Sequence, residues 1–317
     1  MWLRVSLNLT SQNRKEQKGN VAAFQFATTY NPTAPVHGGP EAERFGGYWQ
    51  EILFGYYNPV AVLEQNNNDQ KRKASLINVD ADFKLIDGLK IGARYSREDI
   101  SWLDGSYYRS DSYLNGFSSN GSASRNINDI ETQLFETTLS YNKDLGDFGL
   151  DAVAGYSYQE FTNESFNANG GDFITDELLY NNLGLSQDFT NGLGNVGSYK
   201  GASKLIGSFA RVSLNYLDTF FLNASIRREG STKFGENNKW GNFPGVGAGI
   251  DFSQLLDSDK ITQLKLRGSY GITGAVPSSN YLSQLRFSSG NNFFYNGEFI
   301  PAFRPSSNPN PDLKWEK

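Results

Sequence analysis

Short segments in which apolar and polar residues alternate constrain the fold of this chain most strongly. In residues 77–85 the apolar side chains occupy every second position, and Asn78, Asp80 and Asp82 lie between them. Because side chains alternate across a β-strand, each such segment predicts a strand with one apolar and one polar face. The same pattern recurs in residues 3–9, 89–95, 135–141, 148–158, 210–216, 220–226, 244–252 and 264–272. The chain is therefore predicted to be all-β.

The connections between these segments alternate in length. Short turns are predicted at Asp87-Gly88, 144–146 and 217–219, and long polar segments at roughly 100–130, 160–202 and 229–241. An antiparallel transmembrane β-barrel has tight turns on one rim and long loops on the other, whereas a β-sandwich has no such rule. Positions predicted to face lipid are Val79, Ala81, Phe83, Leu89, Ile91, Val212, Leu214, Leu222, Ala224, Leu264 and Leu266.

Strand lengths and aromatic positions agree with a membrane barrel. Several runs reach 10–12 residues, close to the roughly 9–11 that a tilted transmembrane strand needs. Aromatic residues lie near the strand ends, as in the girdles of outer-membrane barrels, although aromatic residues also favour strands in general. These are Tyr95, Tyr141, Tyr156, Tyr158, Tyr216, Phe220, Phe221 and Tyr270. About ten strands are too few for a barrel of about 22 that holds a plug, so we expect an incomplete barrel, an open curved sheet.

Composition narrows the possible functions. A net charge of -5 argues against nucleic acid as a partner. The chain has no cysteine, and its one histidine, His37, lies in a Gly-rich stretch, so no catalytic, metal or cofactor site is predicted. Asp80 and Asp82 are two residues apart on a polar strand face, which favours a row facing the lumen over a catalytic pair. We therefore do not expect an enzyme.

One aromatic-rich patch is a candidate for direct contact with a substrate. Trp102, Tyr107, Tyr108 and Arg109 fall within a predicted long loop. Aromatic rings beside hydrogen-bonding groups suit stacking on sugars or capture of peptides. Packing within the loop, or contact with a partner protein, explains the same residues.

Four motifs resemble one family. They are Tyr30-Asn31-Pro32-Thr33-Ala34-Pro35-Val36, the stretch Arg228–Pro244, the run Leu264–Gly274, and Asn308–Glu316 with Pro309, Pro311 and Trp315. Together, and in this order, they resemble the SusC/RagA-like TonB-dependent outer-membrane transporters of Bacteroidetes. The residues that carry the resemblance are Asn31, Pro32, Gly230, Phe234, Gly235, Trp240, Gly241, Phe243, Pro244, Gly271, Gly274 and Trp315.

The resemblance implies a location in the outer membrane and import of oligosaccharides or peptides. It implies two partners: a SusD-like surface lipoprotein, and the TonB complex through N-terminal parts of such a protein. Met1 is the only methionine, and the sequence stops just after the Trp315 motif. We therefore expect residues 1–317 to be part of a single barrel domain, with signal peptide, TonB box, plug and final strands absent. A passive porin-like barrel or a surface adhesin is the alternative.

Overall fold

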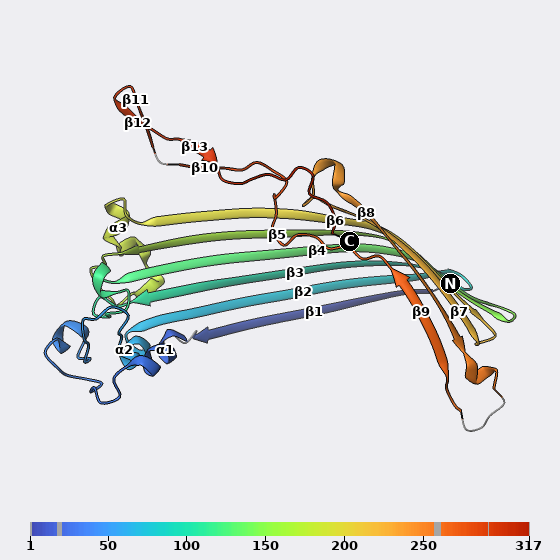
Figure 1. Cartoon of the computed structure of the whole chain (residues 1–317), viewed down its shortest axis with the longest axis horizontal. Coiled ribbons are helices and arrows are strands. Elements are labelled where there is room, and N and C mark those ends of the chain that lie inside the picture. Colours follow the sequence, from blue (N-terminus) through green and yellow to red (C-terminus); the bar gives the residue numbers. More distant parts are fainter. Residues whose placement is uncertain (1, 18–20, 257–260, 291, 317) are drawn as a thin grey trace.

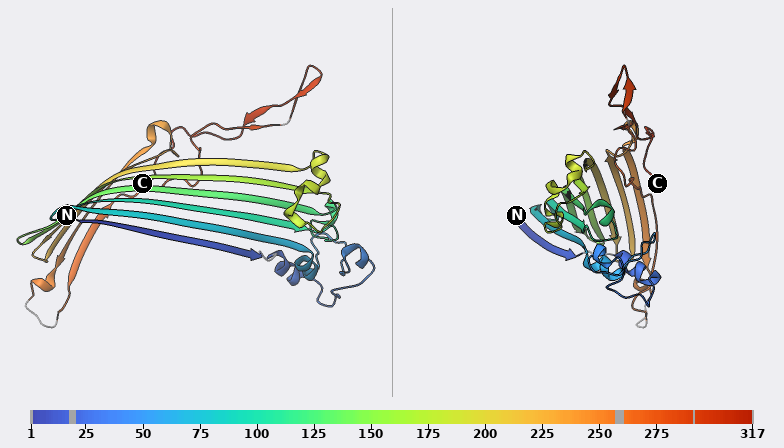
Figure 2. Two further views of the ribbon diagram at one scale, coloured as in Figure 1. Left: turned by 180° about the vertical axis from the view of Figure 1, so that it is seen from behind. Right: turned by 90° about the vertical axis from the view of Figure 1, so that its left-hand side faces the viewer.

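A computed structural model describes residues 2–17, 21–256, 261–290 and 292–316. Its main feature is one nine-stranded sheet in which every strand pairs antiparallel with its neighbours in sequence, in the order β1 to β9 (Figure 1). The strands are β1 (Trp2–Gln17), β2 (Asn66–Ile86), β3 (Leu89–Tyr108), β4 (Ser122–Leu145), β5 (Phe148–Gly171), β6 (Asn195–Tyr216), β7 (Phe220–Ser231), β8 (Trp240–Asp251) and β9 (Lys265–Gly271). The sheet curves but does not close within the described residues (Figure 2). The predicted open antiparallel sheet is confirmed.

Smaller elements lie in the connections and after β9. The helices are α1 (Val21–Thr29), α2 (Pro59–Glu64) and α3 (Gln187–Thr190), with short 3-10 turns η1 (Ala42–Phe45), η2 (Phe117–Ser119), η3 (Leu179–Asn181), η4 (Leu183–Leu185), η5 (Glu236–Asn238) and η6 (Phe252–Gln254). Two small hairpins follow, β10 (Phe287–Ser289) with β13 (Phe303–Pro305), and β11 (Phe293–Tyr295) with β12 (Glu298–Ile300). In the described residues, no helix is both long and apolar enough to span a membrane.

The two rims of the sheet differ as predicted. Because consecutive strands are antiparallel, the connections 87–88, 146–147, 217–219 and 252–264 lie on one rim, here called the turn rim. The connections 18–65, 109–121, 172–194 and 232–239 lie on the other, the loop rim. The tight turn after β6 places Leu217 and Asp218 at φ values of 51° and 50°, a pair of left-handed residues that suits the twist of a hairpin.

The strands extend much further than predicted. β3, β4 and β5 cover 20, 24 and 24 residues. Residues 100–108, 122–130, 160–171 and 195–202, which lie in segments that we predicted as loops, are therefore strand. That prediction was wrong because it relied on period-two alternation of apolar residues. Alternation of this kind marks a strand with only one face in water, and it fades where both faces are wet.

The apolar positions near the turn rim share one face. Residues paired across an antiparallel sheet point to the same side, and the row Phe83, Ile91, Leu139, Ala154 and Ala210 is continuous by register. Phe83 and Ile91 are two of the eleven predicted lipid-facing residues, and eight of the other nine lie on this face by the same register; Leu264 precedes β9 and stands outside the pairing. We call this the lipid-side face and its reverse the lumen-side face.

Two aromatic rows border the apolar band. The row nearest the turn rim contains Phe148, Tyr216 and Phe220. The centre of the Tyr216 ring lies 4.5 Å from that of Phe148 and 6.3 Å from that of Phe220. The far row joins Tyr95, Phe135 and Tyr158. The next row contains Arg97, Gln133, Glu160 and Lys204, so the apolar band ends there. Strands β2 to β6 therefore continue well past the band toward the loop rim.

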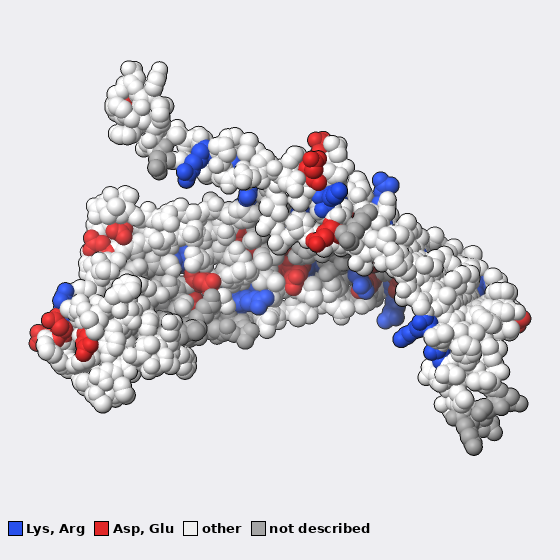
Figure 3. All heavy atoms as spheres, viewed as in Figure 1, with Lys and Arg blue, Asp and Glu red and all other residues white. Residues whose placement is uncertain are grey.

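The lumen-side face near the turn rim is polar and its charges are paired. Asp82 meets Lys90 at 3.5 Å, and Asp151 meets Arg211 at 3.6 Å. Asp80 is bonded to Arg94. The two aspartates of β2 thus belong to a cross-strand charge network, which agrees with their interpretation as a polar lumen row. Figure 3 shows charged side chains in separate patches between broad uncharged areas.

Candidate functional site

The candidate substrate-contact residues lie on and just after the loop-rim end of β3. Trp102 pairs with Arg72 and Asn128, so it points to the lumen side, and Tyr108 points the same way. Both are half-buried, and Arg109 follows directly after the strand. The prediction that this patch forms a loop was therefore wrong, since three of its four residues are in β3.

Tyr107 points to the opposite face and is completely buried. Its ring packs against Phe173 at 5.4 Å, in a small core shared with Ala123 and Tyr180. The Tyr107 hydroxyl donates to the Asp176 carboxylate at 2.7 Å. With 0% exposure, this side chain offers no surface to a ligand, so its position assigns it to packing the loop against the strand.

Asp176 ties the connection between β5 and β6 to the end of β3. Its carboxylate accepts bonds from the Ser110 backbone N–H at 3.0 Å and the Ser110 hydroxyl at 2.8 Å, and Arg109 lies 3.8 Å away. Desolvation by burial acts to raise the pKa of Asp176, but the bonds from Tyr107 and Ser110 outweigh it, so this pKa is lowered. Burial, followed by the bond to Asp176, raises the pKa of Tyr107. Arg109 also bonds Asp111 at 3.1 Å, so its guanidinium is held in place.

Three of the four family motifs converge at the loop-rim ends of β7, β8 and β9. The Trp315 ring lies 4.7 Å from the Phe234 ring and 5.1 Å from the Phe243 ring. Phe234 and Trp315 are 2% and 7% exposed. The Trp315 indole N–H donates to the Lys239 carbonyl at 2.9 Å. This motif cluster fixes residues 311–316 against the sheet.

Two glycines of the motifs lie where a Cβ would collide, one with backbone and one with an aromatic ring. A Cβ on Gly235 would lie 1.7 Å from the Pro311 carbonyl oxygen, and the Gly235 N–H donates to the Leu313 carbonyl at 2.9 Å. A Cβ on Gly274 would lie 2.3 Å from the Phe243 ring. The other motif positions Gly230, Trp240, Gly241, Pro244 and Gly271 lie in β7, β8 and β9 around the same cluster.

Pro244 fits its strand for a definite reason. Its carbonyl accepts from the Ile272 N–H at 3.0 Å, so its nitrogen also faces the β9 side. The pairing between β8 and β9 ends at Gly245 opposite Gly271, so it stops one residue before Pro244, which has no N–H to donate. A proline is tolerated where no ladder bond is lost.

The remaining motif lies apart, in the long connection between β1 and β2. The Tyr30 ring stacks on Tyr56 at 4.8 Å, and its hydroxyl donates to the Trp49 carbonyl at 3.1 Å. Asn31 accepts from the Thr33 N–H at 3.0 Å, which forms a local turn at Pro32. These residues belong to a small folded unit with α1, α2 and the buried Phe45, which the sequence did not indicate.

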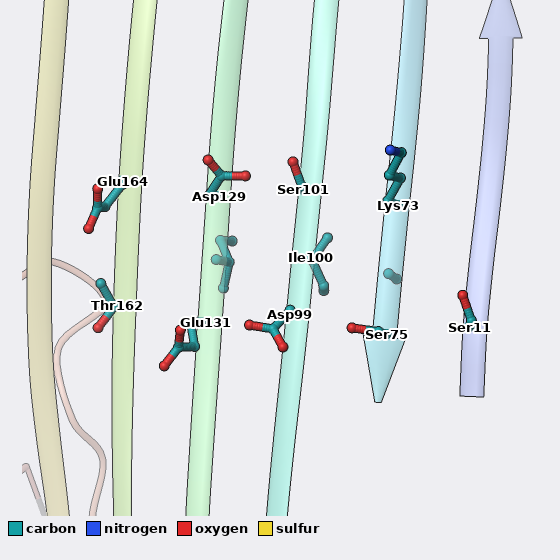
Figure 4. A pocket seen from close by; sticks show the side chains of 12 residues that line it. Ser11, Lys73, Ser75, Asp99, Ile100, Ser101, Asp129, Glu131, Thr162 and Glu164 are labelled. Atoms are coloured by element: carbon teal, nitrogen blue, oxygen red, sulfur yellow. The ribbon is translucent and has the colours of Figure 1, made fainter. Parts of the chain in front are cut away.

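A belt of mixed charge crosses the lipid-side face just beyond the far aromatic row. Figure 4 shows part of it, with Asp99, Glu131 and Glu164 on neighbouring strands. Arg97 bridges Asp99 and Glu131, each at 2.9 Å, and Lys204 lies 3.5 Å from Glu160. Asp99, Asp129, Glu131 and Glu164 line a shallow hollow of about 450 Å³. In the described residues, no three His, Cys, Asp or Glu side chains are grouped to hold a metal ion. The belt marks where the sheet leaves an apolar environment.

The comparison with protein families decides the class of this sheet. The family described as TonB dependent receptor-like, beta-barrel, matches residues 6–317. The chain belongs to the TonB-dependent receptor family. Members of this family are outer-membrane β-barrel transporters rather than enzymes, so the predicted location in the outer membrane and the antiparallel barrel wall are confirmed.

Relatives of this TonB-dependent receptor support the resemblance seen in the motifs. The chain is 30% identical to TonB-dependent receptor P3 of Formosa agariphila over 82% of this chain and 26% of the relative. It is 26% identical to TonB-dependent receptor SusC of Bacteroides thetaiotaomicron over 99% of this chain and 33% of SusC. The chain thus spans about a quarter to a third of the length of these curated relatives.

Solved structures show the same fold. The structure of the RagAB peptide transporter superposes with a TM-score of 0.79 at 19% identity, over 99% of this chain and 35% of the other. The open-open state of the RagAB peptide importer gives a TM-score of 0.77 at 20% identity, over 100% of this chain and 35% of the other. The SusC/RagA-like resemblance is therefore confirmed for the family and the fold.

Proposed function

We propose that residues 1–317 form part of the barrel wall of a TonB-dependent transporter that imports oligosaccharides or peptides across the outer membrane. The observation that carries this proposal is the family match over residues 6–317. The polar lumen-side face, with its paired charges across β2, β3, β5 and β6, suits a wall that borders a hydrated passage.

The proposal includes two protein partners. A SusD-like surface lipoprotein would deliver cargo at the loop rim, and the TonB complex would supply energy through a plug and a TonB box in other parts of the protein. The relative named SusC and the solved RagAB complexes motivate this assignment. Residues 1–317 would then belong to a single barrel domain with no catalytic role.

Trp102, Tyr108 and Arg109 are the proposed cargo contacts in this segment. The two rings lie on the lumen-side face at the loop rim, where incoming cargo would meet the wall. Arg109 follows Tyr108 in the chain, and its guanidinium is held by Asp111. Tyr107 is left out of this set because it is buried.

Uptake measurements in the native host test the proposal. Cells with the gene deleted and then restored would be supplied with labelled maltoheptaose or a labelled octapeptide, with and without a working TonB complex. We expect uptake of one of them to need both the gene and TonB. Uptake that needs the gene but not TonB would favour a passive porin-like barrel, and unchanged uptake of both would favour an adhesin.

Variants of the proposed contacts refine the test. Replacing Trp102 and Tyr108 by alanine should reduce uptake several-fold at limiting cargo. The matched control is Tyr270→Ala, because Tyr270 is an exposed aromatic residue on the lipid-side face. Equal uptake by the two variants would remove Trp102 and Tyr108 from the cargo path.

A further inference from the structure

The wall has a step in height between β6 and β7. β6 begins at Asn195, but its pairing with β7 begins only at Leu205, opposite Ser231. Residues 195–204 therefore have β5 on one side and no strand on the other (Figure 1). From Leu205 to the turn rim, this side of β6 is already paired with β7. Further barrel strands added beside β1 or β9 would therefore not cover residues 195–204.

The backbone groups that face the open side can be assigned. The Lys204 N–H donates to the Thr232 hydroxyl at 2.9 Å, and the Ala202 N–H donates to the Tyr281 hydroxyl at 3.0 Å. Backbone groups alternate along a strand, so those of Val196, Ser198 and Lys200 point the same way. Within the described part of the chain, nothing bonds these three N–H and C=O pairs.

One lysine, Lys200, lies on this edge, and its charge is paired with Glu164. The edge contains no proline, and its register with β5 runs from residue 169 opposite 195 to residue 163 opposite 201 without a bulge. Exposed edges of this kind are templates for an added strand. A short, regular and open edge at the loop rim is therefore suited to bind an extended polypeptide through its main chain.

We propose that the β6 edge, residues 196–202, binds peptide cargo as an added β-strand. This inference rests on the proposed function and narrows its cargo to peptides, because a sugar chain lacks the regular ladder of N–H and C=O groups that the edge matches. Three free positions spaced by about 7 Å fit an extended peptide of about five residues. Main-chain pairing does not depend on the side chains of the peptide.

A small hollow lies at the end of the edge nearest β7. It has a volume of about 190 Å³ and is lined by Ala202, Thr232, Lys233, Asn280 and Tyr281, among others. The buried Asn280 side-chain oxygen has no hydrogen-bond partner in the described structure, and Tyr281 sits at a strained φ of 63°. Strained residues cluster where ligands are held, so we place one end of the bound peptide in this hollow.

Binding measurements on the full-length transporter test the edge directly. The probes are a fluorescein-labelled octapeptide of Ala, Ser and Thr and a copy methylated on every backbone nitrogen. Ser198→Pro removes an N–H that faces the open side, whereas Ser198→Ala keeps it. We expect Ser198→Pro to weaken octapeptide binding at least tenfold, Ser198→Ala to change it less than twofold, and the methylated copy to bind wild type at least tenfold more weakly.

Each other outcome overturns the inference. Equal binding of the methylated and unmethylated peptides to wild-type protein would refute main-chain pairing. This comparison does not use the Ser198→Pro variant, so it holds even if that variant does not fold. Because residues 1–317 contain no cysteine, Ser198→Cys, with any cysteine elsewhere in the transporter replaced by serine, offers a site for a photoactivated crosslinker. Capture of a lipoprotein instead of the added octapeptide would assign the edge to a partner and refute the cargo role.

The failure of this inference differs from the failure of the proposed function. TonB-dependent uptake of maltoheptaose without octapeptide binding would refute the edge and leave the transporter function intact. Octapeptide binding that is weakened by Ser198→Pro but not by Ser198→Ala, without any TonB-dependent uptake, would support peptide binding at the β6 edge and refute the transport function.

Discussion

The substitution Val212→Arg places a charge near the middle of the apolar band of β6. Val212 pairs with Ala152 and Ala224 on the lipid-side face and is 42% exposed in the isolated sheet. An arginine there would face hydrocarbon in the membrane-inserted transporter. Its neighbour Ser213 pairs with Asp151 and Asn223 on the lumen-side face, where a charge stays hydrated.

The depth of Val212 follows from the two aromatic rows. On β6 the apolar band runs from Tyr216 to Ile206, ten residue steps. At a rise of about 3.3 Å per residue and a tilt of about 40°, this is about 25 Å, the usual height of the apolar band of such barrels. Val212 then lies about 10 Å from the Tyr216 row and close to the midplane, whereas Leu214 lies only about 5 Å from that row.

The expected costs differ by depth and by face. Arginine at the midplane of a barrel destabilises it by about 2–4 kcal/mol, and near the interface by about 0–1 kcal/mol. We therefore expect Val212→Arg to cost about 2–4 kcal/mol, with Leu214→Arg costing clearly less and Ser213→Arg costing least. The measurement is equilibrium unfolding of the full-length transporter in lipid vesicles, followed by tryptophan fluorescence. Equal costs for Val212→Arg and Ser213→Arg would refute the assignment of the faces.

Three further predictions concern the rim and the motif cluster. Gly235→Ala should destabilise the transporter by about 3 kcal/mol in thermal unfolding, because the added Cβ meets the Pro311 carbonyl. The control Gly268→Ala has open space at the position of its Cβ and should be close to neutral. Similar shifts for the two variants would contradict the close approach at Gly235. Trp315→Ala should cost about 3–5 kcal/mol and expose residues 311–316 to protease, and unchanged proteolysis would show that the ring does not anchor them. The pKa of Asp176 is lowered from its ordinary 3.8, so the ionised carboxylate stabilises the fold above pH 3.8 and this stabilisation is lost as pH falls through the lowered pKa. Hydrogen exchange of residues 172–186 should therefore speed up at low pH more than it does in an Asp176→Asn variant. Parallel pH profiles of the two proteins would refute this.

The sequence alone determined the features that lipid imposes. Alternation in residues 77–85 and 210–226 identified the lipid-side face, because a strand between hydrocarbon and water has to separate its side chains. The tight turns at Asp87-Gly88 and 217–219 identified the turn rim. The four motifs were sufficient to indicate the family.

The tertiary structure decided what happens beyond the membrane. Beyond the apolar band, β3 no longer separates hydrocarbon from water and alternation no longer distinguishes strand from loop, so residues 100–108 were missed as strand. Neither local pattern nor spacing showed that Tyr107 would be covered by Phe173 and Tyr180, since burial there depends on a loop some seventy residues away. The meeting of Phe234 with Trp315 and the open edge of β6 arise in the same way, from contacts between distant segments and from unequal strand lengths that only the assembled sheet defines.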